Sequence, residues 1–218
     1  MATHGGEGVI KYDLQFTTGP NDFDRYDILD LIKCRDALYA LGLVGTSGKY
    51  CGRDDRGCET VGYGNVSLLL PNGRIAISGT QTGGIVHLEV EDFTTILECY
   101  PEINRVVAQG PKRKPSSEIM THKTVYNISP NTKAVVHVHS DRLWKATHEN
   151  RLTVPMTSIN VEYGTPEMAY EVRRLFGEAD LDRIKFFGMK GHEDGFVSFG
   201  SNVDEAQAKM VEYFNKAL

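Results

Sequence analysis

The chain has 218 residues, of which 40% are hydrophobic and 24% charged, and its formal net charge is −5 at pH 7. This composition is typical of an ordinary globular protein, and the length suits one large domain or two small ones. The negative net charge argues against general nucleic-acid binding. It does not argue against an anionic small molecule, which needs only a local positive site. No apolar run reaches the ~18 residues of a membrane-spanning helix, so we expect no membrane partner.

The first residues and the cysteines indicate a reduced, cytoplasmic protein. Residues 1–8 lack the charged start and the apolar centre of a signal peptide, so we expect them to form a flexible tail. The chain has four cysteines without a Cys-x-x-Cys pair, which favours structural thiols over a disulfide framework. These cysteines are Cys34, Cys51, Cys58 and Cys99.

The hydrophobic pattern up to residue 110 predicts one helix, short strands and tight turns. The helix is expected from the candidate caps Asn21 and Asp22 to Gly42, because apolar residues recur there at helical spacing. The Gly- and Asp-rich stretch 47–62 lacks this spacing and indicates a loop. Two pairs of apolar runs are separated by turn residues, Asn72-Gly73 in the first pair, and predict β-hairpins. The expected strands cover residues 9–16, 62–70, 74–78, 93–100 and 105–109.

Beyond residue 110, helices and strands alternate. Thr165-Pro166-Glu167 is a strong helix start, with a capping threonine, a proline in the first turn and an acidic residue near the positive end of the dipole. The expected helices cover residues 118–127, 142–149, 165–176 and a last stretch from Ser201 or Asp204 onward. The expected strands cover residues 134–140, 154–161, 184–189 and 195–199. Hairpin-length turns dominate the middle, so the sequence predicts a single α/β domain over residues 1–218, built on a mostly antiparallel sheet.

The stretch 134–140 contains two histidines, His137 and His139, in a run of strand-forming residues. Successive strand side chains alternate between faces, so His137 and His139 point to the same side and Val136 points into the core. Two neutral imidazoles on one face form half of a metal site, although two ordinary histidines on a half-exposed strand would give the same pattern. His192, in a glycine-rich loop, is the natural third ligand; a plain surface-loop role is the alternative.

A helix start and the two ends of the first hairpin are further candidates. Ser116 and Ser117 precede Glu118, and exposed amide groups at such a helix start attract anions. Glu118 becomes a general acid/base if this helix start lies beside the histidines, and is otherwise a routine first-turn acid. Asn65 and the pair Ser78-Gly79 would form an anion pocket or serve as turn residues.

In this order, five motifs resemble the class II aldolase/adducin family, over roughly residues 25 to 215. The motifs are Gly64-Asn-Val-Ser67, Ile77-Ser-Gly-Thr80, Pro115-Ser-Ser-Glu118, Val135-Val-His-Val-His-Ser140 and Gly191-His192. The resemblance implies a three-layer α/β/α domain with a central, mostly antiparallel sheet. It also implies a homotetramer with active sites between subunits, and a divalent metal: zinc, or manganese, iron or cobalt.

The resemblance also assigns roles to residues of this sequence. His137, His139 and His192 match the family's metal ligands, and Glu118 matches its catalytic glutamate. The positions that match its substrate-phosphate site are Asn65, Ser78, Gly79, Ser116 and Ser117. The implied function is a lyase of carbohydrate metabolism. It would cleave or form a C–C bond in a sugar phosphate or hydroxy-keto acid, through a metal-stabilised enediolate. Alternatives on the same scaffold are a sugar-phosphate epimerase, a dehydratase or a non-catalytic adducin-like binding module.

Three departures from the fuculose phosphate aldolases of this family bear on the substrate. Residues 141–161 form a shorter segment without a counterpart of the family's intersubunit tyrosine, and Tyr163 lies nearby. The loop from His192 to Gly195 is two residues longer than the usual His-Gly. The Ser78-Gly79 motif lacks a preceding proline. These departures leave the predicted metal ligands intact and leave both phosphorylated and unphosphorylated carbonyl substrates open.

Overall fold

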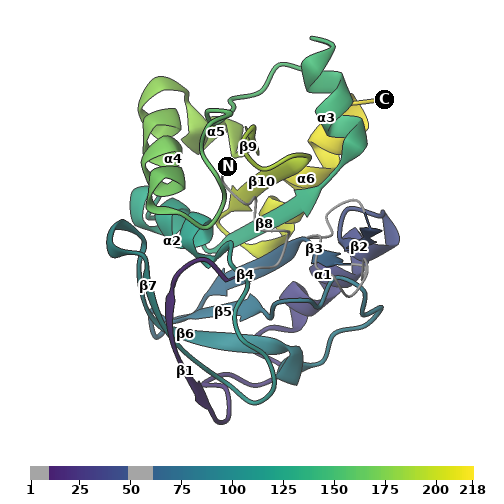
Figure 1. Cartoon of the computed structure of the whole chain (residues 1–218). Coiled ribbons are helices and arrows are strands. Elements are labelled where there is room, and N and C mark those ends of the chain that lie inside the picture. The colour runs from purple at the N-terminus through teal and green to yellow at the C-terminus, as the bar shows by residue number, and fades with distance from the viewer. Residues whose placement is uncertain (1–9, 49–60) are drawn as a thin grey trace.

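The computed structural model describes residues 10–48 and 61–218, which form an eight-stranded sheet flanked by helices (Figure 1). The strand order is β1-β7-β6-β5-β4-β8-β10-β9. The strands are β1 (Asp13–Thr18), β4 (Asn65–Leu69), β5 (Ile75–Ser78), β6 (Phe93–Tyr100), β7 (Arg105–Gly110), β8 (Ala134–His139), β9 (Phe186–Met189) and β10 (Gly195–Gly200). A separate ribbon pairs β2 (Gly45–Ser47) with β3 (Val61–Tyr63).

The sheet is mostly antiparallel, as predicted. Among the described residues its one parallel pair is β1 with β7, at one edge. Both predicted hairpins are present: β4 pairs with β5 across Asn72-Gly73, and β6 pairs with β7. Gly73 has a φ of 81°, a left-handed conformation that favours glycine. In β6–β7 the turn ends at Asn104, which also takes a left-handed conformation.

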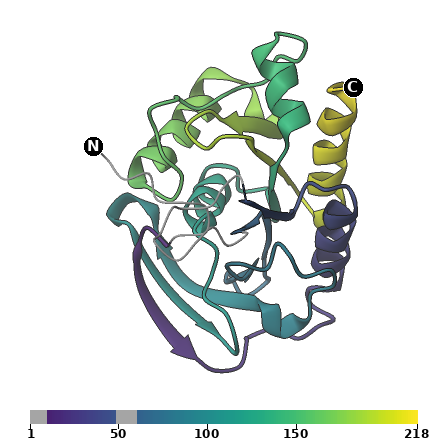
Figure 2. The same ribbon diagram turned by 45° about the vertical axis from the view of Figure 1, so that its right-hand side comes forward.

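Helices cover both faces of the sheet and give three layers. They are α1 (Leu29–Ala40), α2 (Ile119–Ile128), α3 (Asp141–His148), α4 (Pro166–Glu178), α5 (Leu181–Ile184) and α6 (Val203–Lys216), with 3₁₀ turns η2 (Val90–Asp92) and η3 (Pro101–Ile103). One core packs α1, α3 and α6 against Val136 and Val138, and in Figure 2 α1 and α6 lie side by side on this face. The other core packs α2 and α4 against Val135 and Val197. The alternation along β8 therefore holds as predicted. Full burial of each of these valines contributes about 1.5–3 kcal/mol.

Two predictions about local structure are wrong. Helix α1 begins at Leu29 and not near Asn21, whose side-chain amide donates to the carbonyl oxygens of Val90 and Phe93 at 3.1 Å. Residues 154–161 form no strand; Met156 alone makes an isolated parallel bridge, to Gly188 of β9. Pro155 has no N–H to donate, which prevents a continuous ladder at this edge.

Helix caps are only partly as predicted. Thr165 caps α4, accepting from the backbone N–H of Met168. The cap of α6 is Asn202, between the expected Ser201 and Asp204, and its side-chain oxygen accepts from Glu205 N at 2.8 Å. The sequence also allowed Ser116 or Ser117 to cap α2, but its N-cap position is Glu118, without a side-chain cap hydrogen bond.

Parts of the predictions lie outside the described residues. These are the tail 1–8, Cys51, Cys58 and most of the expected loop 47–62, whose two ends belong to β2 and β3. Cys34 and Cys99 are buried free thiols, as expected. No helix within residues 10–48 and 61–218 is long and apolar enough to cross a membrane.

Candidate metal centre

Three buried histidines converge at one end of β8. Each of His137, His139 and His192 offers a nitrogen, and these nitrogens all lie within 4.8 Å of one another. The ring centroids of His137 and His139 are 5.0 Å apart, as expected for alternate residues of one strand face. The Nε2 atoms of His139 and His192 are 2.8 Å apart. The side chains that the sequence placed on one face and in a distant loop therefore meet.

The sheet and a tight turn hold these imidazoles in place. β8 lies between β4 and β10, with Asn65 and Val197 opposite His137. His192 sits in the turn between β9 and β10, where its backbone N–H donates to the Met189 carbonyl oxygen at 2.9 Å. A side chain at Gly191 would overlap the backbone carbonyl of Val161, so only glycine allows the turn this close to that segment.

The donor set suits a divalent cation. The Nδ1 of His137 is 3.2 Å from the carbonyl oxygen of Phe196, to which it donates. A neutral imidazole carries one N–H, so this hydrogen bond leaves the lone pair on Nε2 of His137. A backbone carbonyl that fixes the tautomer in this way is the usual outer partner of a metal-binding histidine. Three imidazoles with such geometry match catalytic zinc sites that keep a further position for substrate.

Glu118 lies directly beside this cluster. Its carboxylate is buried, with 1% of the side chain exposed, and its Oε1 is 3.3 Å from Nδ1 of His192. The start of α2 therefore lies next to the histidines. An acid/base role for Glu118 was expected only with this arrangement. Because water is largely excluded here, the interaction between carboxylate and imidazole is stronger than it would be at the surface.

The five residues matched to the family's phosphate site fall into two places. Asn65 lies opposite His137, and its buried Oδ1 has no hydrogen-bond partner among the described residues. Gly79 makes an isolated bridge with Pro115, which brings the end of β5 next to the two serines before α2. Asn65 therefore joins the metal centre, whereas the other four residues, Ser78, Gly79, Ser116 and Ser117, gather beside the start of α2.

Two of these groups already have internal partners. The N–H of Gly79 donates to the Asp92 carbonyl oxygen at 2.8 Å, and Ser78 Oγ accepts from Val66 N at 3.1 Å. Gly79 thus offers no free amide to an anion. Ser78 keeps its hydroxyl proton as a donor.

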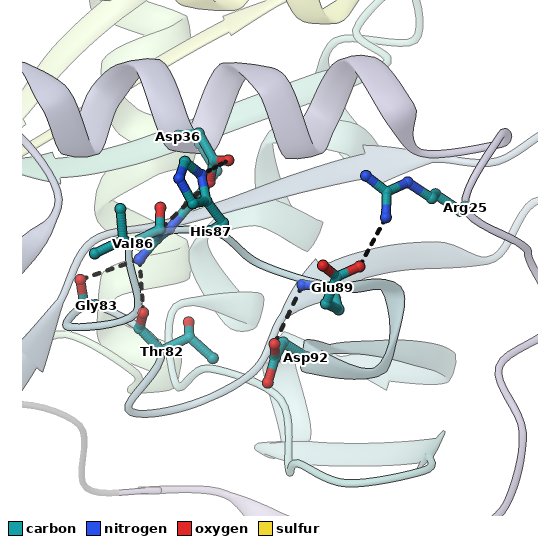
Figure 3. A network of polar contacts seen from close by, with 9 residues as sticks. Arg25, Asp36, Thr82, Gly83, Val86, His87, Glu89 and Asp92 are labelled. Carbon is teal, nitrogen blue, oxygen red and sulfur yellow. Dashed lines mark hydrogen bonds and ion pairs between the residues drawn. The ribbon is translucent and has the colours of Figure 1, made fainter.

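Buried Arg35 fixes the loop that follows Gly79. Its guanidinium donates to the carbonyl oxygens of Thr82, Gly83 and Val86 at 2.6, 3.0 and 3.1 Å (Figure 3). Only 1% of Arg35 is exposed, and burial lowers the pKa of its guanidinium. Three carbonyl acceptors compensate for part of that desolvation, so the loop is tied to α1 from inside.

Asp92 anchors the other end of this loop. Its Oδ1 accepts from Lys112 Nζ at 3.0 Å and from Arg113 Nε at 2.9 Å. Its Oδ2 accepts from Glu89 N (Figure 3). Burial raises the pKa of Asp92, but the hydrogen bonds from Arg113 and Lys112 outweigh it and the pKa is lowered. The two basic residues therefore brace the approach to α2.

Tyr163 and His122, to which the sequence assigned no role, also lie near the centre. The ring centroid of Tyr163 is 4.2 Å from that of His192, and Lys11 Nζ lies 3.8 Å from the Tyr163 ring centroid. His122 is fully buried one helical turn after Glu118. The i, i+4 spacing from Glu118 was a usable signal for His122, whereas no local pattern marked Tyr163.

A surface cavity of about 270 Å³ reaches the centre from the side of His139. Its wall includes Tyr63, whose ring centroid is 5.5 Å from that of His139, and Asp141 and Arg142 at the start of α3. The His139 imidazole therefore lines a polar-rimmed cavity, although only 3% of the residue is exposed.

A mixed α/β fold thus carries three histidines that could hold a metal ion, with a carboxylate beside them, at one end of the sheet. The chain belongs to the class II aldolase and adducin family: residues 52–217 match the domain described as Class II Aldolase and Adducin N-terminal domain. By name, the proteins to which the chain is similar include a decarboxylase, a dehydratase and an aldolase.

Among the relatives, 3-oxo-tetronate 4-phosphate decarboxylase from Escherichia coli is 36% identical over 89 residues, which cover 39% of this chain and 36% of that protein. Methylthioribulose-1-phosphate dehydratase from Methylococcus capsulatus is 28% identical over 178 residues, 70% of this chain and 79% of that protein. The fold is similar to that of L-fuculose-1-phosphate aldolase from Thermus thermophilus, with a TM-score of 0.60 and 19% identity over 87% of this chain and 89% of the other. The match to the decarboxylase thus spans about a third of that relative's length.

Proposed function

We propose that the protein is a divalent-metal-dependent lyase acting on a small carbonyl compound that carries hydroxyl groups. The observation that carries this proposal is the position of Glu118, whose Oε1 lies 3.3 Å from His192 Nδ1 beside three converging imidazoles. A buried carboxylate next to a metal site is in position to take and return a proton. A binding module without catalysis would not require that arrangement.

His137, His139 and His192 would hold the metal ion. When bound, a divalent cation supplies Lewis-acid polarisation of the substrate carbonyl and compensates for negative charge that develops on the substrate. Zinc suits a three-histidine set, and manganese, iron and cobalt bind similar sets. The hydrogen bond from His137 Nδ1 to Phe196 keeps the imidazole orientation fixed whether or not a cation is present.

Glu118 would remove a proton from the substrate and return it to the product. Its position at the N-cap of α2 keeps the carboxylate fixed relative to the histidines. The low exposure of the site excludes water and strengthens the electrostatic interactions that stabilise the developing charge. The fold would therefore both hold the Glu118 carboxylate in position and stabilise the charge that develops on the substrate.

A phosphorylated substrate is favoured over an unphosphorylated one. Ser116 and Ser117 precede α2 next to the end of β5, and a hydroxyl-rich helix start is suited to phosphate. The relatives described above act on phosphorylated compounds by name. Cleavage of a C–C bond in a sugar phosphate is the first candidate reaction. Dehydration is the second, because the dehydratase relative aligns over the larger share of this chain, 70%.

An activity screen of metal-loaded protein tests the proposal. Purified protein would be reloaded with zinc, manganese, iron or cobalt and incubated with sugar phosphates and with hydroxy-keto acids, reading aldehyde or pyruvate release and loss of water by mass spectrometry. We expect about one metal ion per chain and turnover of a phosphorylated substrate that chelator abolishes. Protein that binds well below one ion per chain after reloading would instead favour an adducin-like binding module.

The assembly and location belong to the same proposal. We propose a cytoplasmic homotetramer with active sites near subunit contacts, as in the family. Tyr163 already packs on His192 within one chain, so the neighbouring subunit would add residues on another side of the centre. Light scattering after size-exclusion chromatography measures the oligomeric state directly.

A further inference from the structure

The cavity of about 270 Å³ beside His139 contains a cationic side chain that the proposed function does not use. The turn after α1, the start of α3 with Arg142, and Phe214 of α6 form its wall. Pockets for small molecules begin at about 300 Å³, so this space suits a compact ligand. Because His139 lines the same cavity, a molecule held by a cation at the histidines can extend into it.

Backbone hydrogen bonds fix the wall of this cavity relative to the end of β8. The N–H of His139 donates to the carbonyl oxygen of Leu43 at 3.1 Å, which ties the turn after α1 to the strand. Ser140 is the N-cap of α3, and its hydroxyl oxygen accepts from the N–H of Leu143 at 3.3 Å. Arg142 therefore follows the candidate metal ligand His139 in the first turn of a capped helix.

The guanidinium of Arg142 is oriented but not neutralised. Its Cζ lies 4.0 Å from the ring centroid of Phe214, a cation–π contact that holds the side chain against α6. No residue within 10–48 and 61–218 forms an ion pair or a side-chain hydrogen bond with this guanidinium. A guanidinium that stacks on a ring keeps the N–H groups in its own plane as donors for a ligand.

The polar groups of the cavity suit a hydroxy acid. Arginine binds a carboxylate or a phosphate through two parallel hydrogen bonds, which the ammonium group of lysine does not provide. The hydroxyl groups of Ser47 and Tyr63 line the same cavity and can bond to hydroxyl groups of a ligand. Asp141 also lines it, but this carboxylate lies in the first turn of α3, where the helix dipole stabilises it, and forms no ion pair with Arg142.

The two ends of the proposed substrate would lie beside different imidazoles. Glu118, which directly follows the two serines proposed to bind phosphate, is 3.3 Å from His192. The cavity with Arg142 adjoins His139 instead. A phosphate group at the serines therefore leaves this cavity for the other end of the molecule.

We propose that this cavity is a substrate subsite in which Arg142 binds a carboxylate, so that the substrate is a phosphorylated hydroxy acid with a carbonyl group. This inference rests on the proposed function, because it takes the middle of that substrate to be held at the histidines. Arg142 would bind and orient the substrate without taking part in proton transfer. A sugar phosphate without a carboxylate would leave Arg142 without a ligand.

Two analogues that lack a carbonyl group test the subsite without turnover. The probes are 4-phosphoerythronate and erythritol 4-phosphate, which differ only in having a carboxylate or a hydroxymethyl group at the end far from phosphate. In calorimetry with zinc-loaded protein, we expect the acid to bind about 10–100-fold more tightly, the range for hydrogen bonds between charged groups. Arg142→Met should remove this difference and leave the binding of erythritol 4-phosphate unchanged. Arg142→Lys should restore part of the difference, because it keeps the charge without the paired donors.

Arg183→Met is the matched control, because it removes an exposed arginine of α5 that does not line the cavity. It should bind both probes as the parent does, and the thermal unfolding midpoint and zinc content show that each variant is folded and loaded. A preference for the acid that persists in Arg142→Met would place the carboxylate on the metal ion. Weaker binding of both probes to that variant would place the phosphate at Arg142. Either result overturns the proposal, as does failure of both probes to bind the parent.

The proposed function and the subsite can fail separately. Binding of the acid that depends on Arg142, without turnover of any compound in the activity screen, would contradict the proposed reaction and leave the carboxylate site standing. Turnover of a sugar phosphate without a carboxylate, with the same kcat/KM in the parent and in Arg142→Met, would support a lyase and overturn the subsite.

Discussion

The Nε2 atoms of His139 and His192 lie 2.8 Å apart although the residues are 53 positions apart in the chain. The antiparallel register of β8 and β10, which sets His139 opposite Gly195, brings the turn with His192 over the end of β8. At this distance one nitrogen must carry a proton that the other accepts. A cation held by both nitrogens would need both lone pairs, so each ring would then carry its proton on Nδ1.

Replacing His139 by alanine should abolish metal binding and leave the fold intact. The site stands on a sheet with its own apolar cores, so removing one ligand costs affinity and little packing. Metal content after reloading, together with the thermal unfolding midpoint of metal-free protein, measures the two effects. His148→Ala, which removes an exposed histidine of α3, is the control. Unfolding of metal-free His139→Ala would contradict a purely catalytic metal.

Glu118→Gln should keep the metal and lose turnover. Glutamine preserves the shape of the side chain, but it cannot accept a proton from substrate. We expect kcat to drop about 10²–10⁴-fold, the range for loss of a general acid/base. Steady-state kinetics and metal analysis of the same preparation give both quantities. Near-normal kcat would remove Glu118 from the acid/base role.

Gly191→Ala should weaken both the fold and the metal centre. The added methyl group would overlap the Val161 carbonyl, so the turn that carries His192 must shift. We expect a loss of about 1–3 kcal/mol in the free energy of unfolding and at least about tenfold weaker metal binding. Gly177→Ala is the matched control, because nothing lies within 4 Å of the added atom. It should be neutral or slightly stabilising in denaturant titrations.

Glu205→Gln should destabilise the protein at neutral pH and have no effect in strong acid. Hydrogen bonds from Lys185 and then from Ser201 lower the pKa of Glu205 to about 2. Because this pKa lies below the unfolded value of 4.5, the stabilisation is complete above pH 4.5 and is lost as the pH falls toward 2. The side chain is 32% exposed, so we expect about 1 kcal/mol after solvent screening. A difference between variant and parent that does not shrink over this range would contradict the assignment.

The sequence determined the features that depend on near neighbours. Asn72-Gly73 between two apolar runs predicted the β4–β5 hairpin, and Thr165-Pro166 predicted the start of α4. The alternation along 134–139 predicted that His137 and His139 share a face. These patterns follow from backbone sterics and period-two or helical spacing, so they need no knowledge of the rest of the chain.

Predictions from the local sequence pattern were wrong where contacts with distant residues determined the local structure. Asn21 has the chemistry of a helix cap, but it bonds to the carbonyls of Val90 and Phe93, and α1 begins eight residues later at Leu29. The apolar run 154–161 resembles a strand, but within it only Met156 forms a β-bridge, to Gly188. In both cases hydrogen bonds that are set by tertiary contacts decided the local structure.

Only the tertiary structure decided which side chains stand around the histidines. The packing of Tyr163 on His192, the approach of Glu118 to His192 and the hydrogen bonds from Tyr126 through Ser67 to His122 each join elements that are far apart in the sequence or on different layers. Hydrophobic periodicity determines which face a residue occupies. Strand order and register determine what lies opposite it, and these depend on the packing of the whole sheet.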